Sequence, residues 1–263
     1  MAKSMHWVAQ HVDDGGWDDL GPRLWDVIPK SEPYIWDRLP KTAEKRLVDL
    51  IPNFVPLSER LSSLDRNYEL RRQIAPALVT AGGARMALLA RWIIAEWGGI
   101  RGGSKDPGRD PIPKWTSALT GFSARAVEVF IDGQKNERIS SWSKVLAFAR
   151  PDDEAIYDAR IAVALNVGLR ALDSSQRFHM PVGRNGPVAR AAAVLTGRAQ
   201  PMGYRDYRAF LRSVRTARGV SLLEAETTIF ANAPKLCGDF MRMIEDQATP
   251  AAQRACRLGI EGR

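Results

Sequence analysis

Apolar side chains recur at helical spacing along most of this chain, and that pattern constrains the fold more than any other feature of the sequence. The segment 84–97 follows the helical period and predicts a buried central helix. A second helix is predicted from Asp158, which suits the N-cap position, through Leu172. No run of β-branched residues alternates with polar ones, so we expect no major sheet. We therefore predict an all-α fold.

Capping residues mark the ends of further predicted helices. Ser123 is predicted to cap a helix that runs to Asp132. The sequence Ser-Leu-Leu-Glu, which begins at Ser221, fits a capping box and predicts a helix to about Phe230. Pro234 suits the first turn of another helix, because that position needs no backbone N–H.

The chain has 263 residues, which is enough for two helical lobes with a cleft between them. We predict a neutral, Trp-rich lobe over residues 1–135 and an Arg-rich lobe over 136–263, and the two lobes are allowed to interleave. The Gly- and Pro-rich stretch 98–113 marks another candidate boundary or mobile segment. All eight tryptophans lie between Trp7 and Trp142. They either stack on nucleobases or build the core of the neutral lobe, and their aliphatic neighbours favour the core.

The positive charge of the chain is concentrated in its last part. Residues 1–159 carry 22 basic and 22 acidic side chains, whereas 160–263 carry 16 basic and 8 acidic ones. Fifteen of those 16 basic residues are arginine, whose planar fork of donors suits phosphate oxygens. A GC-rich genome explains arginine in place of lysine, but it does not explain the scarcity of acidic residues. The charge therefore favours a polyanionic partner, with nucleic acid first.

Composition excludes several classes of protein. Two cysteines cannot build a disulfide framework, and three histidines leave little for a zinc site. We therefore expect no cofactor and no metal. The N-terminal sequence has no apolar signal region, and the most apolar stretch, 86–97, contains Arg91. These features predict a cytoplasmic protein without a membrane span.

The segment 139–166 places a lysine and an aspartate at the starts of two successive predicted helices. A polar turn over 140–143 is expected to lead into a short apolar helix that Lys144 opens, and Asp158 caps the next helix. The helix dipole and apolar neighbours both favour the neutral, nucleophilic form of such a lysine. A capping aspartate is suited to stabilise positive charge on a sugar ring or to help deprotonate the amine. The structural alternative is a surface lysine and an ordinary N-cap.

This pattern resembles the helix-hairpin-helix DNA glycosylases, in particular their 8-oxoguanine DNA glycosylase-like branch. That family has a hairpin, a catalytic lysine that opens the next helix, and an apolar stretch ending in an aspartate that caps the following helix. Lys144 matches the lysine, and Asp158, within Tyr-Asp-Ala-Arg, matches the aspartate. The resemblance implies an all-α, two-lobe fold with DNA bound between the lobes. It also implies excision of a flipped base, with Lys144 attacking the sugar C1′ and forming a Schiff base that permits strand cleavage.

The resemblance covers about two helices and their hairpin, and it departs from the family at two points. The family hairpin is usually Gly-x-Gly, whose backbone N–H groups hold a phosphate, whereas residues 140–143 read Ser-Ser-Trp-Ser. The spacing from Lys144 to Asp158 is also shorter than in the usual members. We expect serine hydroxyls to supply part of the DNA phosphate contacts, from Ser140, Ser141 and Ser143.

Two further residues have both a functional and a structural interpretation. Phe148 lies one helical turn beyond Lys144 on the same face, so it either lines a base pocket by stacking or belongs to the core. Arg160 follows Asp158 by two residues and either contacts a DNA phosphate or remains a surface charge.

An amphipathic basic helix is predicted over 204–219. Its arginines recur at steps of three and four residues and so share one face, and we expect DNA contacts from Arg208, Arg212 and Arg215. The basic loop 177–187 adds Arg184 and Asn185 as expected DNA contacts. Two alternatives are a membrane-surface helix and a face whose arginines pair with acids elsewhere.

Together these features favour a DNA base-excision glycosylase, with or without an AP lyase step, that acts on double-stranded DNA containing a modified base. The alternative is a non-catalytic helix-hairpin-helix protein that binds DNA in a repair or phage-defence complex. A helical transcription regulator is a weaker third hypothesis, because no helix-turn-helix recognition helix can be placed. We expect a monomer in the cytoplasm, associated with the nucleoid.

Overall fold

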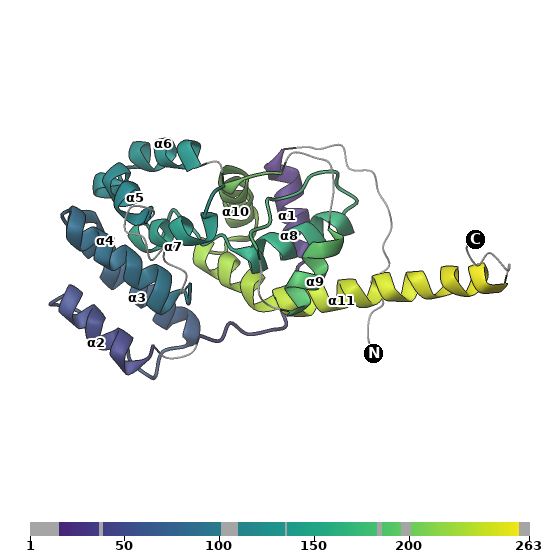
Figure 1. The fold of residues 1–263 in the computed structure, drawn as a ribbon, viewed down its shortest axis with the longest axis horizontal. Helices are drawn as coiled ribbons and strands as arrows, with labels where there is room; N and C mark the ends of the chain where they lie inside the picture. Colours follow the sequence, from purple (N-terminus) through teal and green to yellow (C-terminus); the bar gives the residue numbers. More distant parts are fainter. Residues whose placement is uncertain are drawn as a thin grey trace.

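The chain is helical throughout, which confirms the predicted all-α fold (Figure 1). The computed structural model describes residues 16–36, 39–100, 110–134, 136–182, 186–195 and 201–257. Within these ranges an isolated parallel bridge between Phe178 and Met202 takes the place of any sheet. The helices are α1 (Trp17–Val27), α2 (Lys41–Leu50), α3 (Ser63–Thr80), α4 (Gly83–Arg91), the π-helix η1 (Trp92–Trp97), α5 (Ile112–Ala118), the 3-10 turn η3 (Thr120–Phe122), α6 (Ala124–Gln134), α7 (Ile139–Ala149), α8 (Ala159–Ala171), α9 (Gly186–Val194), α10 (Tyr204–Arg218) and α11 (Leu222–Arg257).

The helices form two groups along the long axis of the molecule (Figure 1). Helices α2 to α7 lie at one end, with α7 packed on α3 and η1. Helix α1 does not join them, although it comes first in the chain; it packs against α10 and α8, beside α9 and α11. The groups therefore do not divide at residue 135, the predicted boundary between the lobes. Helix α1, which precedes that residue, lies with α8 to α11, and α7, which follows it, lies with α2 to α6. None of the helices in the described ranges combines the length and apolar character that crossing a bilayer requires.

Three predicted N-caps are present and bond as expected. Ser123 Oγ accepts a hydrogen bond from Ala126 N at 3.2 Å and caps α6. Asp158 Oδ1 accepts from Ile161 N at 3.1 Å and caps α8. Ser221 Oγ accepts from Glu224 N at 3.1 Å where α11 begins. Each cap begins its helix through a bond to a backbone N–H only three residues ahead, and such local bonds can be predicted from the sequence.

The predicted polar turn over 140–143 is wrong, because these residues belong to the first turn of α7. The turn lies earlier, at 136–138, where Asn136 and Arg138 adopt positive φ angles of 66° and 50°. Ile139 and Trp142 are three residues apart and both are buried, so burying them together favours a helix over a turn. Lys144 consequently lies in the second turn of α7 rather than at its start.

The helix predicted to end at Phe230 instead continues, so α11 is one helix that contains Pro234. Proline removes one backbone hydrogen bond from a helix interior. Ile229 and Ala233 before the proline, and Cys237 after it, are all buried where α11 packs on α8 and α9. Burial of this continuous apolar face on both sides of Pro234 offsets the lost bond.

A helix over 84–97 is present, but it is not central, because α4 lies near one end of the molecule and Leu88 is exposed (Figure 1). Its last six residues are wound as a π-helix. Gly98 N donates to Ile93 O at 2.9 Å, five residues back, and ends η1. Single π-turns of this kind are frequent at functional sites. Of the Gly- and Pro-rich stretch 98–113 that follows, residues 101–109 lie outside the described part of the chain.

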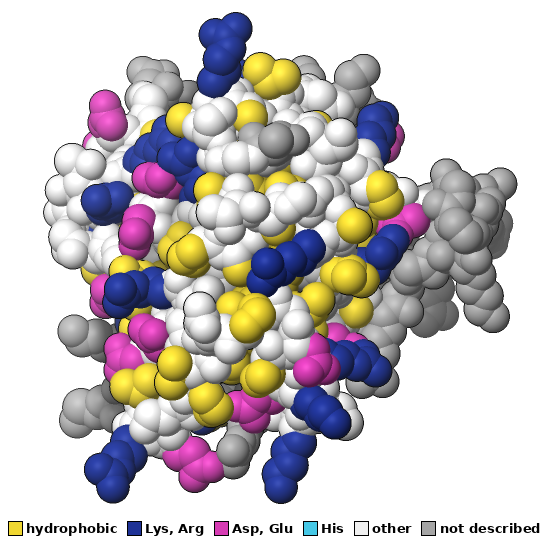
Figure 2. Space-filling view, turned by 90° about the vertical axis from the view of Figure 1, so that its left-hand side faces the viewer, with side chains coloured by type: hydrophobic (Ala, Val, Ile, Leu, Met, Phe, Trp, Pro, Cys, Tyr) yellow, Lys and Arg dark blue, Asp and Glu magenta, His cyan; other side chains and the backbone are white. Residues whose placement is uncertain are grey.

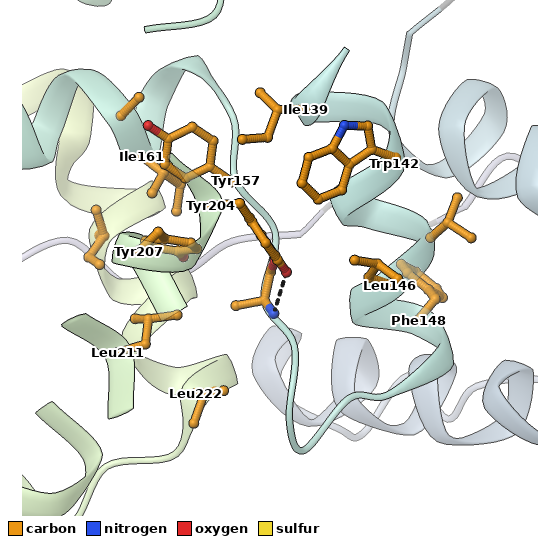
Figure 3. Close-up of a cluster of buried hydrophobic side chains, with 14 of the residues drawn as sticks. Ile139, Trp142, Leu146, Phe148, Tyr157, Ile161, Tyr204, Tyr207, Leu211 and Leu222 are labelled. Carbon is orange, nitrogen blue, oxygen red and sulfur yellow. Dashed lines mark hydrogen bonds between the residues drawn. The ribbon is translucent and has the colours of Figure 1, made fainter. Parts of the chain in front are cut away.

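A cluster of aromatic rings fills the core where the two groups of helices meet (Figure 3). Trp142 of α7 packs edge-on against Tyr204 of α10, with ring centroids 4.9 Å apart. Tyr157 packs against Tyr207 in the same way, at 5.1 Å. The Tyr204 hydroxyl donates to the Ala155 carbonyl at 2.6 Å. These contacts hold the segment 155–157, and Asp158 follows it directly.

Candidate functional site

Lys144 and Asp158 line one pocket of about 480 Å³. The pocket lies where five parts of the chain meet: residues 34–36 and 39–40 before α2, the end of η1, helix α7, the start of α8 with the residues before it, and α11. The structure therefore brings together the two residues that the sequence singled out, although they are 14 positions apart on different helices.

The Lys144 side chain is almost fully buried in the pocket wall, with 5% of its surface exposed. Its Nζ donates to the Ser140 carbonyl at 2.7 Å, one turn earlier in α7. Burial lowers the pKa of the Lys144 amine, and the charge of Arg71 lowers it further, whereas Asp158 and Glu226 oppose the shift. At a given pH a larger fraction of Lys144 is therefore neutral than of an ordinary exposed lysine, and the neutral amine is the nucleophilic form.

Asp158 is positioned by its own helix and by α7. One carboxylate oxygen accepts from Ile161 N, and within the described residues the other takes no hydrogen bond. Ser143 Oγ donates to the Tyr157 carbonyl at 3.2 Å and accepts from Tyr157 N at 3.1 Å. One serine side chain thus ties the helix that carries the lysine to the segment that carries the aspartate.

The expected DNA contact of Ser143 is therefore wrong. Its side chain is fully buried and both hydrogen-bonding roles of its hydroxyl are used by Tyr157. Ser140 and Ser141 are half-buried in the first turn of α7, and the Ser140 carbonyl holds the Lys144 amine. Ser141 lines a separate, smaller pocket that also includes Arg138.

The sequence did not reveal a buried ion pair that involves Glu226, a residue of the pocket wall. Glu226 of α11 accepts from the Arg71 guanidinium of α3 at 2.6 and 3.1 Å, and from Ile156 N at 2.7 Å. Arg71 Nε donates to Asn67 Oδ1, and Asn67 Nδ2 donates to the Tyr34 hydroxyl. Burial raises the pKa of Tyr34 to about 12. Arg71 and Glu226 are 155 residues apart, so no linear pattern marks them as partners.

Aromatic side chains supply much of the pocket wall. Trp36 and Trp97 lie with ring centroids 6.4 Å apart, and Tyr34 meets Phe230 edge-on at the same distance. The Arg160 guanidinium lies over the Phe230 ring at 4.5 Å. Arg160 therefore lines the pocket, with its side chain held against an aromatic ring.

Phe148 does not line the pocket, so its expected place in a base pocket is wrong. It is fully buried and meets Trp97 edge-on at 4.9 Å. Trp97 is the ring that lines the pocket instead. Tryptophans were expected in the core, and four of them are buried there: Trp25, Trp92, Trp115 and Trp142. Trp36 and Trp97 line the pocket instead.

The arginine face of α10 is largely paired. Arg208 is buried, and its guanidinium contacts Glu128 at 2.6 Å and Glu154 at 3.0 Å. Its expected DNA contact is therefore wrong, because both acids already neutralise it within the fold. Arg212 and Arg215 are exposed and form no ion pair with any described residue.

The other expected DNA-binding residues Arg184 and Asn185 lie outside the described part of the chain. At the end of the molecule where α2 and α4 lie, Lys and Arg side chains alternate with Asp, Glu and hydrophobic side chains (Figure 2). The described residues on that end therefore present charges of both signs rather than a basic surface.

Among the described residues, no group of three or more His, Cys, Asp and Glu side chains is suited to hold a metal ion. No protein-family model matches the chain, and no curated protein or solved structure matches it.

Proposed function

We propose that the chain is a DNA base-excision glycosylase in which Lys144 is the nucleophile and Asp158 stabilises the charge that develops on the sugar. Its substrate is a modified base flipped out of double-stranded DNA. The observation that carries this proposal is the shared pocket: a buried lysine with a lowered pKa and a helix-capping aspartate face one aromatic-walled space.

The chemistry follows from what each side chain supplies. The neutral Lys144 amine attacks C1′ of the nucleotide, and the glycosidic C–N bond breaks with its electron pair leaving on the base, which takes up a proton. The Asp158 carboxylate stabilises the positive charge on the sugar as that bond breaks. Opening of the sugar ring then gives a Schiff base between C1′ and Nζ, from which the neighbouring phosphate can be eliminated. Borohydride reduces this C=N bond and traps the adduct.

The aromatic wall supports a flat, ring-shaped ligand. Stacking of a nucleobase on an aromatic side chain contributes about 1–3 kcal/mol per base. Trp36, Trp97 and Phe230 come from three different elements and line one space of about 480 Å³. A flipped base is recognised by such stacking together with polar groups at its edge. Arg160, Tyr34 and Thr227 line the same pocket and carry polar groups for that role, as does Glu96, which pairs with Arg46.

A second candidate is a non-catalytic helix-hairpin-helix DNA-binding protein that belongs to a repair or phage-defence complex. The bond from Lys144 Nζ to the Ser140 carbonyl favours it, because the amine is then used inside its own helix. The turn before α7 also contains no glycine among its described residues 136–138, so phosphate would meet side chains there.

Trapping with borohydride separates the two candidates. Labelled duplexes that contain 8-oxoguanine or an abasic site are incubated with the protein, and covalent adducts are resolved on a denaturing gel. The glycosylase gives an adduct that Lys144→Gln abolishes, and Asp158→Asn slows its formation by at least about 100-fold. Lys114→Gln, which removes an exposed lysine on α5, is the matched control and leaves the adduct unchanged.

The binding candidate gives a different set of results. No adduct forms with either duplex, and Lys144→Gln binds DNA as tightly as the unchanged protein. That outcome would reject catalysis by Lys144. Circular dichroism of each variant verifies that loss of the adduct does not reflect loss of the helical fold.

A further inference from the structure

Position 98 faces the Lys144 side chain directly. Gly98 ends η1 at the pocket, one residue after Trp97. A Cβ built on Gly98 would lie 2.8 Å from Lys144 Cδ, 2.9 Å from Lys144 Cε and 2.9 Å from the Ile94 carbonyl oxygen. Side chains essentially never pack that closely. Any side chain at position 98 would therefore collide with the lysine and with the π-helix.

The requirement at position 98 is for space rather than for backbone freedom. Gly98 has φ −84° and ψ −6°, angles that every residue type adopts. By contrast, the φ of +66° at Gly99 favours glycine for conformational reasons, and a Cβ there would meet nothing within 4 Å. Gly98 is thus the one of the two whose missing side chain makes room for Lys144.

Both sides of this contact are fixed. The Lys144 side chain is buried, and its amine is bonded to the Ser140 carbonyl. The backbone opposite is held by one π-type bond, from Gly98 N to Ile93 O at 2.9 Å, and by a bond that spans six residues, from Ile100 N to Ile94 O at 3.0 Å. A methyl group at position 98 therefore cannot be accommodated without displacing one of them, and the lysine chain is the more flexible partner.

We propose that Gly98 is a positioning residue for the Lys144 amine, because the space it leaves keeps that amine bonded to the Ser140 carbonyl in the pocket wall. The inference rests on the proposed function for the importance of the amine, but the geometry itself involves no DNA. The charged groups around the amine come from four elements: Asp158 and Arg160 at the start of α8, Glu226 of α11, Arg71 of α3, and Glu96 of η1, which pairs with Arg46.

Gly98→Ala is expected to push the lysine side chain away from η1 and into the open pocket. There the amine loses its bond to Ser140, is less desolvated, and faces the carboxylates of Asp158 and Glu96. Each of the last two changes stabilises the charged amine. The pKa of Lys144 should therefore rise toward that of an ordinary lysine, and the amine should become more accessible.

Amine acetylation measured as a function of pH reports both effects. The folded protein is pulsed with a small N-hydroxysuccinimide ester between pH 6.5 and 10.5, and acetylation of Lys144 is quantified by peptide mass spectrometry. The pH midpoint reports the pKa of the amine, and the plateau at high pH reports its accessibility. In Gly98→Ala we expect a higher plateau and a midpoint raised by about one pH unit, so that at pH values well below both midpoints the rate relative to the plateau falls about tenfold.

Two glycine variants serve as matched controls. Gly168→Ala places a Cβ 2.6 Å from Leu24 Cδ1 in the core between α8 and α1, so it overpacks the fold without touching Lys144. Gly133→Ala in α6 meets nothing within 4 Å. Neither variant should move the midpoint, whatever it does to stability. The exposed Lys114 amine in each sample corrects for loss of reagent.

A folded Gly98→Ala protein with the midpoint of the unchanged protein, or a lower one, would overturn the inference. If Gly98→Ala does not fold, the double variant Gly98→Ala/Lys144→Ala removes the lysine atoms that the methyl group strikes and leaves only its contact with the Ile94 carbonyl oxygen. The double variant should then show helical circular dichroism and a melting transition, and a double variant that also fails to fold refutes the lysine contact as the cause. Acetylation uses no DNA, so the two proposals can fail separately. A shifted midpoint in Gly98→Ala without a borohydride adduct in the unchanged protein rejects only the proposed function. An adduct in the unchanged protein with an unshifted midpoint in Gly98→Ala rejects only the role of Gly98.

Discussion

Glu226→Gln tests whether the buried ion pair between Arg71 and Glu226 stabilises the fold beside the pocket. Glu226 and Arg71 have side chains that are 6% and 0% exposed, and the carboxylate accepts three hydrogen bonds. Glutamine keeps one acceptor for Ile156 N but leaves the Arg71 charge buried without a counter-charge. Removing one partner of such a pair costs about 3–5 kcal/mol. For a chain of this size that corresponds to a fall of about 6–20 °C in melting temperature.

Thermal and urea unfolding, followed by circular dichroism at 222 nm, measure this loss. The double variant Arg71→Met/Glu226→Gln removes both charges and still leaves an acceptor for Ile156 N. It should be more stable than Glu226→Gln alone, because no buried charge is left unpaired. A loss below about 1 kcal/mol in the single variant, or a double variant less stable than the single one, would refute the reasoning.

Further predictions concern the charges around α10. Burial raises the pKa of Glu154 to about 7, above its ordinary value of 4.5, so the folded state binds this proton more tightly and stability falls as pH rises between these values. Glu154→Gln should remove a loss of about 3 kcal/mol across that interval, seen as a flatter pH dependence of the urea midpoint than in the unchanged protein. Arg208→Ala should cost about 3–5 kcal/mol of stability, because it leaves Glu154 buried without its partner. The double variant Arg212→Ala/Arg215→Ala should leave the melting temperature within about 1 °C of that of the unchanged protein. If α10 contacts DNA, the variant should also lower the slope of log affinity against log salt concentration by up to about 2. An unchanged slope means that DNA binds elsewhere.

The sequence was most informative where structure depends on neighbouring residues. Asp158 and Ser123 were placed correctly because an N-cap bonds to amides only three residues ahead. The serine-rich run before Lys144 was misjudged because serine favours turns locally, while burial of Ile139 and Trp142 against other helices decided the outcome. Local preference was overruled there by tertiary packing.

The candidate site was predicted only in part for a related physical reason. Lys144 and Asp158 belong to one short segment, so their types and spacing were visible together. Glu226 reaches the pocket from α11 and is held by Arg71 of α3, and their pairing depends on how distant helices pack. The charge of Arg208 was visible in the sequence, but its burial against α6 was not. Charge alone therefore overstated the basic surface of α10.

The place of α1 has a consequence for how the chain folds during synthesis. This helix is synthesised long before α8 and α10, the helices on which it packs, and its Asp26 pairs with Arg218, 192 residues later. Its apolar side chains Leu20 and Leu24 are both fully buried in the finished fold, and they are covered completely only after α8 and α10 have been made. Contacts of such long sequence separation form late and slowly. The nascent chain must therefore carry an exposed amphipathic helix until α8 and α10 have been made, and closure of this part of the fold waits for them.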